Sequence, residues 1–194
     1  MVEVMKNFYK ELPVGYKEIK VIDAKDKKTI IIMYSLSIVL FLAAILPFFL
    51  LKPINISIEN STDIIGPMVL MIGGMFGYII LHELVHGFWY KILTKEKLTF
   101  GITLTVAFCG VPNIYVNKKT ALLAITGPFL LFSLILIPIL IIIPANLTYF
   151  VLVMIFGCSG DLYGTFYMLT QNNTLLMNDT GPKQTFYDID NDMK

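Results

Sequence analysis

The sequence predicts an all-α membrane protein, a bundle of four transmembrane helices with a small β-hairpin in the cytoplasmic loop between the second and third helices. Two observations predict this fold class. Of the 194 residues, 56% are hydrophobic and 15% are charged, whereas about a quarter of the residues in a soluble domain are charged. In addition, four stretches hold the roughly 20 apolar residues that a helix needs to cross a bilayer. They run over Thr29–Leu51, Ile64–Tyr90, Thr120–Ile143 and Thr148–Thr170.

The placement of lysines predicts the orientation of these stretches. All basic residues are lysines; seven precede the first stretch and five lie between the second and the third, whereas the other two loops share only Lys52. The positive-inside rule then places both termini and the middle loop in the cytoplasm, as in a multi-pass protein of the cell membrane. The chain divides accordingly into a cytoplasmic N-terminal segment (residues 1–28), a transmembrane domain (residues 29–170) and a cytoplasmic tail (residues 171–194).

The middle loop carries a second kind of pattern. From Leu98 to Phe108, hydrophobic residues occupy every second position, a period typical of a half-buried strand. The segment CGVPN is a turn signal, and IYV is a short return strand. We therefore expect a hairpin over Leu98–Val116 at the cytoplasmic membrane surface. It offers either a strand edge to which an extended peptide can add or an amphipathic lid. The polar tail is expected to hold one short strand at its centre.

The second apolar stretch contains both histidines of the chain, His82 and His86, with Glu83 between them. Side chains four residues apart project from one face of a helix, so the two imidazoles can bind one Zn²⁺. His-Glu-x-x-His is the pattern of zinc peptidases, in which zinc acidifies a water molecule and the glutamate takes its proton. The alternative is a pair of hydrogen-bonded core histidines. Metal binding is favoured because ionisable groups inside membrane spans are costly and usually functional.

A catalytic zinc site needs a third protein ligand and an open position for water. The four stretches contain two acidic residues, Glu83 and Asp161. If the second and fourth stretches both run inward, His82 and Asp161 both lie in the cytoplasmic half of the bilayer. We therefore predict that His82, His86 and Asp161 bind Zn²⁺; the alternative for Asp161 is a polar residue at a helix interface. Cys158, on the same helical face as Asp161, is predicted to be a packed thiol rather than a further ligand.

Several motifs together resemble one family. The segments LPVGYKEIKVID, HELVHG, the strand-like loop, ITGPF and SGDLYG resemble the putative zincin peptidases, a family of prokaryotic membrane proteins, over roughly residues 11–188. They are more distantly similar to site-2 proteases, the intramembrane zinc metalloproteases, although Gly160-Asp161-Leu162 replaces their aspartate-glycine pair. The resemblance implies a zincin-like metallopeptidase with His82 and His86 as ligands, Glu83 as catalytic acid/base and Asp161 in place of the aspartate ligand.

The functional hypothesis is a membrane-embedded zinc metalloendopeptidase that hydrolyses peptide bonds of membrane or membrane-associated proteins near the cytoplasmic face. Its partners are then a membrane-protein or peptide substrate and the lipid bilayer. A net charge of +1 without a basic cluster argues against nucleic acid as a partner. For an oxyanion donor, Asn113, Tyr78 and Tyr163 are equal candidates. Two other classes stay open: a non-proteolytic membrane zinc-binding protein, such as a sensor or assembly factor, and a small transporter or interaction protein.

Overall fold

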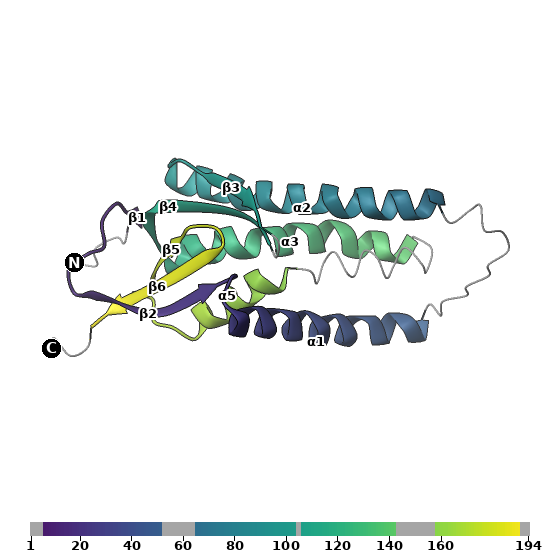
Figure 1. Cartoon of the computed structure of the whole chain (residues 1–194), viewed down its shortest axis with the longest axis horizontal. Coiled ribbons are helices and arrows are strands. Elements are labelled where there is room, and N and C mark those ends of the chain that lie inside the picture. Colours follow the sequence, from purple (N-terminus) through teal and green to yellow (C-terminus); the bar gives the residue numbers. More distant parts are fainter. Residues whose placement is uncertain (1–5, 52–64, 104–105, 143–157, 191–194) are drawn as a thin grey trace.

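The computed structural model describes residues 6–51, 65–103, 106–142 and 158–190. In this part of the chain, long helices extend from a β-sheet that lies at one end of the molecule, where both termini also lie (Figure 1). The helices are α1 (Lys27–Leu51), α2 (Ile65–Thr94), α3 (Lys118–Ile142) and α5 (Ser159–Leu169). The strands are β1 (Phe8–Tyr9), β2 (Tyr16–Asp23), β3 (Thr99–Ile102), β4 (Ala107–Asn117), β5 (Leu176–Asp179) and β6 (Lys183–Ile189).

Polar residues set the ends of the long helices next to the sheet. Asp26 caps α1, because its carboxylate accepts a hydrogen bond from the backbone N–H of Thr29 at 3.0 Å. Asn117 caps α3 in the same way through the N–H of Thr120 at 2.8 Å. At its C-terminal end, α2 is followed by Lys95, whose φ of 60° is the left-handed conformation that stops a helix. The apolar helices therefore begin or end where the chain enters the sheet.

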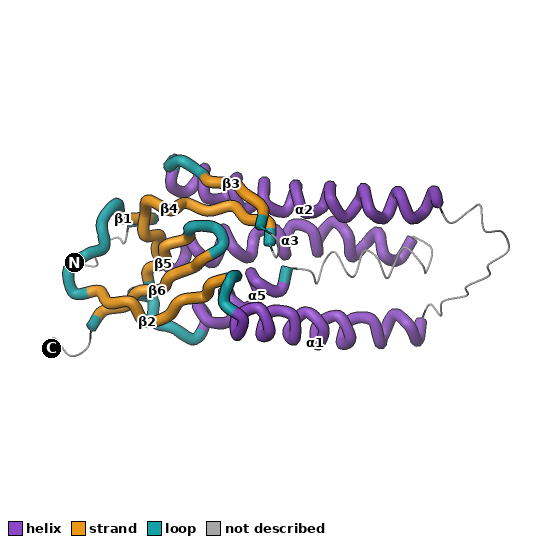
Figure 2. The backbone as a smooth tube through the Cα atoms, in the orientation of Figure 1, coloured by secondary structure: helices purple, strands orange, loops and turns teal. Residues whose placement is uncertain are grey.

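The strands form one antiparallel sheet in the order β1-β4-β5-β6-β2, and β3 also pairs with β4 (Figure 2). The long strand β4 pairs with three other strands: Ala107 lies opposite Ile102 of β3, and Val116 lies opposite Phe8 of β1. On the other side of β4, Val111 lies opposite Asp179 of β5. The N-terminal and C-terminal segments thus meet in one sheet, since β2 pairs with β6 over Tyr16–Asp23.

The prediction of an all-α bundle of four transmembrane helices is wrong. The structure combines helices with a six-stranded antiparallel sheet, and β3 and β4 are part of this sheet rather than an isolated hairpin. Among the described residues, α3 is the one helix whose length and composition suffice to cross a membrane. Of the fourth predicted stretch, the structure describes α5, whose 11 residues are too few to span a bilayer; residues 148–157 lie outside the described part.

The tail, for which one strand was expected, forms both β5 and β6. A tight turn of three residues joins them: the Thr180 N–H donates to the Lys183 carbonyl at 3.0 Å, and Gly181 has a φ of 97°, which glycine adopts without steric cost. The long apolar helices give a stronger local sequence signal than the short strands do. The complete sheet was missed because the pairings of β1 with β4, β4 with β5 and β2 with β6 join segments that are distant in sequence.

The hydrophobic core lies between this sheet and the ends of α2 and α3 nearest to it. Its fully buried members are Tyr90, Val111, Ile114, Val116, Ala121, Ala124, Ile125, Met168, Leu175, Met177 and Phe186. Close contact between α2 and α3 depends on Gly127, because a Cβ atom there would lie 2.4 Å from two ring atoms of Trp89. The last turns of α2 are therefore packed on two sides, by α3 and by β4.

Candidate metal centre

The two histidines lie on the inner face of α2, in the half of the helix that approaches the sheet. His82 and His86 are 7% and 6% exposed, whereas Leu81, Leu84 and Phe88 on the outer face are exposed. The centroids of the two imidazole rings are 4.8 Å apart. The spacing of four residues thus places both rings side by side in the interior, as the sequence predicts.

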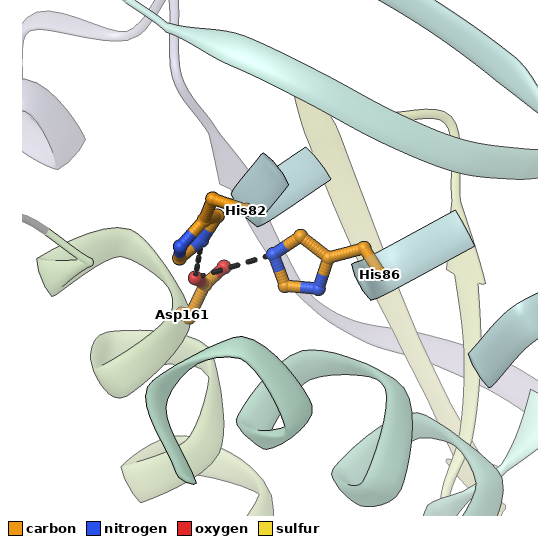
Figure 3. A group of neighbouring side chains, drawn as sticks. All are labelled: His82, His86 and Asp161. Atoms are coloured by element: carbon orange, nitrogen blue, oxygen red, sulfur yellow. Dashed lines mark hydrogen bonds and ion pairs between the residues drawn. The ribbon is translucent and has the colours of Figure 1, made fainter. Parts of the chain in front are cut away.

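Helix α5 brings Asp161 to these rings (Figure 3). One carboxylate oxygen, Oδ2, lies 2.8 Å from Nε2 of His82 and 3.3 Å from Nε2 of His86. Each of these three residues thus offers one possible ligand atom, and the three atoms lie within 4.8 Å of one another. The structure thus brings together the three residues for which the sequence predicts metal binding.

The contacts of His86 show what this group of atoms can hold. Its Nδ1 is 2.8 Å from the carbonyl oxygen of Ala124 in α3, so Nδ1 carries the proton and donates it. The unprotonated Nε2 atom therefore faces an oxygen of Asp161 at 3.3 Å. Two electron-rich atoms this close repel each other unless a proton or a metal ion lies between them. Atoms each about 2.0–2.1 Å from a tetrahedral zinc ion are about 3.3–3.4 Å apart. Two imidazoles and one carboxylate are also an established zinc ligand set, so these residues fit Zn²⁺.

Aromatic rings hold His82 in place. Its ring stacks on Phe132 of α3 at an interplanar angle of 8° and a centroid distance of 6.4 Å. The ring of Tyr78, one turn earlier in α2, is 5.6 Å away. The Nδ1 atom of His82 is buried and has no hydrogen-bond partner among the described residues. The orientation of His82 therefore depends on ring packing and on Asp161, unlike that of His86.

Glu83 is next to the ligands and lines two cavities. The larger, of about 360 Å³, lies between α1, α2, α5 and the start of β4. Its wall includes the site residues His82, Glu83 and Asp161 and the side chains Ile30, Met33, Tyr34, Met75, Tyr78, Ile79 and Val106. The smaller, of about 60 Å³, lies on the sheet side and is lined by Glu83, His86, Asp161, Cys109, Asp179 and Gln184, among others. The Glu83 carboxylate also interacts with the backbone amide of Cys109 in β4. Glu83 thus borders space in which a substrate and water can lie.

A buried pair below the site escaped the sequence analysis. The hydroxyl of Tyr90, one turn after His86, donates a hydrogen bond of 2.6 Å to Oδ2 of Asp179, and the Gly181 N–H donates to Oδ1 at 2.8 Å. Burial raises the pKa of Asp179 to about 6, although these two hydrogen bonds act to lower it. In the sequence, Asp179 reads as a residue of a polar turn. No local signal identifies it, because its partner in α2 is distant in the chain.

The remaining sequence candidates occupy different environments. Tyr78 lines the larger cavity, and its hydroxyl is buried without a hydrogen-bond partner among the described residues. Asn113 is exposed on β4, and Tyr163 packs against the hydrophobic core. Both cysteines are buried; Cys158 lines the larger cavity, and burial raises the pKa of the Cys109 thiol to about 12. Of the three oxyanion candidates, Tyr78 is therefore the best placed.

Comparison with known families identifies the family of the chain. A family model described as "Putative zincin peptidase" matches residues 75–176, which is more than half of the chain. The chain belongs to this family. The matched segment contains His82, Glu83, His86 and Asp161, and zincin peptidases use zinc, for which these residues form the candidate site. No curated protein and no solved structure gave a significant match to the chain. The similarity to site-2 proteases and the prokaryotic membrane setting stay predictions.

Proposed function

We propose that this member of the family is a membrane-embedded zinc metalloendopeptidase, which hydrolyses peptide bonds of membrane or membrane-associated proteins near the cytoplasmic face. The observation that carries the proposal is the convergence of His82, His86 and Asp161 beside Glu83, at a cavity large enough for part of a peptide. The proposed ligands are these three residues, and Glu83 is the proposed catalytic acid/base. A location on apolar helices also supports the relationship to site-2 proteases.

The outer surface of the helices supports the membrane setting. Helix α3 is long and apolar enough to cross a bilayer. Large apolar side chains are also exposed along three helices: Ile31, Ile38, Leu42 and Leu46 on α1, Val69, Phe76, Ile80, Leu84 and Phe88 on α2, and Leu130, Leu134 and Ile141 on α3. Soluble monomers rarely expose contiguous apolar surface of this extent. With both termini and the lysine-rich middle loop at the sheet end (Figure 1), the positive-inside rule supports a cytoplasmic sheet.

The proposed reaction divides the work among residues of this chain. Zinc, when bound, polarises the scissile carbonyl and makes a water molecule more acidic. His82, His86 and Asp161 hold the ion, and the Ala124 carbonyl keeps the Nδ1 proton of His86 away from it. Glu83 takes a proton from the attacking water while the water oxygen forms a bond to the carbonyl carbon. Glu83 then delivers this proton to the nitrogen that leaves as an amine, which balances the reaction.

The zinc requirement is tested on the purified full-length protein. We expect about one zinc ion per chain, because the site offers one set of three ligands. A chelator should abolish hydrolysis of a fluorogenic peptide derived from a membrane segment, and added Zn²⁺ should restore it. Metal content is measured by mass spectrometry alongside the activity. Near-zero zinc in protein purified without chelator, or activity that survives its complete removal, would contradict the proposal.

Tyr78 gives a second expected result. Tyr78 lines the cavity beside His82, and its hydroxyl has no hydrogen-bond partner among the described residues. We propose that this hydroxyl donates a hydrogen bond to the oxygen of the scissile carbonyl as negative charge develops there. Tyr78→Phe should therefore lower kcat by about 10²-fold, the lower end of the effect of removing one oxyanion donor, with little change in KM or zinc content. Tyr163→Phe, a tyrosine that packs on the core, is the matched control. Equal kcat values for the two variants would rule out this role.

A further inference from the structure

The backbone carbonyl of Ala124 in α3 accepts a hydrogen bond from a ligand of the metal centre rather than from its own helix. In an α-helix each carbonyl accepts a hydrogen bond from the N–H four residues later. The residue four positions after Ala124 is Pro128, which lies inside α3 and has no N–H to donate. The Ala124 carbonyl therefore lacks its regular helix partner, at a residue that is 0% exposed.

His86 supplies the missing donor. Its Nδ1 lies 2.8 Å from this same carbonyl oxygen. The opposite ring nitrogen, Nε2, lies 3.3 Å from Oδ2 of Asp161. The hydrogen bond to Ala124 thus fixes both the tautomer and the direction of the ring, and it leaves the Nε2 lone pair facing the centre of the site.

The residue before the proline brings the two helices together. A Cβ atom at Gly127 would lie 2.4 Å from atoms Cδ1 and Nε1 of the Trp89 ring. Trp89 lies in α2, close after His86, so a side chain at position 127 would displace the Trp89 ring or push α2 away from α3. Gly127 permits the approach across which the His86–Ala124 hydrogen bond forms.

We propose that Gly127 and Pro128 are positioning residues of the metal centre. Gly127 allows α2 to pack closely against α3, and Pro128 leaves the Ala124 carbonyl without a helix donor, so that this carbonyl can accept the hydrogen bond that orients His86. This inference rests on the proposed zinc site. An outer partner of this kind typically contributes 10–100-fold to metal affinity. An N–H at position 128 would compete with His86 for the same oxygen, so the imidazole would lose its exclusive partner while all three ligands stayed in the chain.

The test compares Pro128→Ala with Pro138→Ala in the full chain. Pro138 lies in the same helix, and the carbonyl four residues before it belongs to Leu134, whose side chain is exposed, so this variant controls for the general effect of restoring a helix hydrogen bond. Zinc affinity is measured by competition with a chromophoric chelator. We expect Pro128→Ala to raise the Kd for zinc by about 10–100-fold and Pro138→Ala to leave it within about twofold of wild type.

A spectroscopic readout separates orientation from folding. The chain has two histidines, so ¹⁵N-histidine labelling of the zinc-loaded protein gives signals from two imidazoles. In wild type and Pro138→Ala, the Nδ1 proton of His86 should exchange slowly with water; in Pro128→Ala it should exchange faster. Pro128→Gly also restores the N–H and is read in the same way if the alanine variant does not fold.

The outcomes are distinguishable. If the wild type binds zinc and Pro128→Ala has the same affinity and the same Nδ1 signal as Pro138→Ala, the positioning role is overturned and the proposed function stands. If the wild type binds no zinc, the proposed function fails and this inference fails with it. A selective loss at Pro128, with unchanged melting temperature, supports the inference.

Discussion

Glu83→Gln is expected to lower the rate of peptide hydrolysis by about 10²–10⁴-fold, the usual contribution of a general acid/base, while the protein keeps its zinc. The amide has nearly the same shape as the carboxylate and cannot take a proton from water. Glu83 is not one of the three side chains whose ligand atoms converge, so the metal should stay bound. Steady-state hydrolysis and zinc content of the same preparation measure both parts of the prediction.

The matched control is Glu96→Gln, which changes a glutamate after the end of α2 that forms a 3.6 Å ion pair with the exposed Lys10. This variant should hydrolyse peptides at the wild-type rate. Membrane proteomes of cells carrying wild type or Glu83→Gln would also identify substrates as proteins that accumulate in the variant. If the wild type binds zinc, and Glu83→Gln matches it in every assay including the proteome, the protein is a non-proteolytic zinc-binding protein instead.

Asp161→Ala should have the second large effect, loss of the metal itself. Asp161 supplies the oxygen that lies 2.8 Å from His82 and 3.3 Å from His86, so its removal leaves two imidazoles without a shared anionic partner. We expect the zinc affinity to fall by more than the roughly 10–100-fold that loss of an outer partner costs, and activity to fall with it. Competition with a chelator and metal content after gel filtration measure the change.

Asp188→Ala is the control for Asp161→Ala. Asp188 accepts a hydrogen bond from Thr174 at 2.6 Å in the sheet and belongs to neither cavity lining, so its removal should leave zinc affinity unchanged. If Asp161→Ala bound zinc as tightly as this control, the third ligand would have to come from another residue. The proposal that α5 supplies a ligand to the metal centre would then be wrong.

The candidate metal ligands could be picked out from the sequence because ionisable residues are rare in apolar stretches. Ionisable side chains inside apolar stretches are costly to bury, so Glu83, Asp161 and the two histidines stand out against their neighbours. Their common place in the structure follows from helix periodicity and from the direction of the chain. Pro128 could also be seen in the sequence, but its effect on His86 could not, because the link is a backbone oxygen of another helix.

The sheet was not predictable on the same terms. Strand β2 contains Lys17, Glu18 and Lys20, whose charges hide a strand from a search for alternating apolar residues. Its partner is β6, at the other end of the chain, with Val21 opposite Thr185. Such a pairing stabilises both segments only when they meet, so neither one carries the signal alone. Apolar length indicated the positions of the long helices α1, α2 and α3 but not the sheet that they adjoin.

The Tyr90–Asp179 contact implies that the structural unit around the candidate metal centre is larger than the segment that the family model matches. That segment stops at residue 176, three positions short of the carboxylate that receives the Tyr90 hydroxyl at 2.6 Å. A protein truncated after residue 176 would lack Asp179. The buried hydroxyl of Tyr90, one turn after His86, would then lose its acceptor. The β5–β6 hairpin thus supports the end of α2 that carries the candidate ligands, and fragments of the protein intended for assay should retain the chain through Ile189.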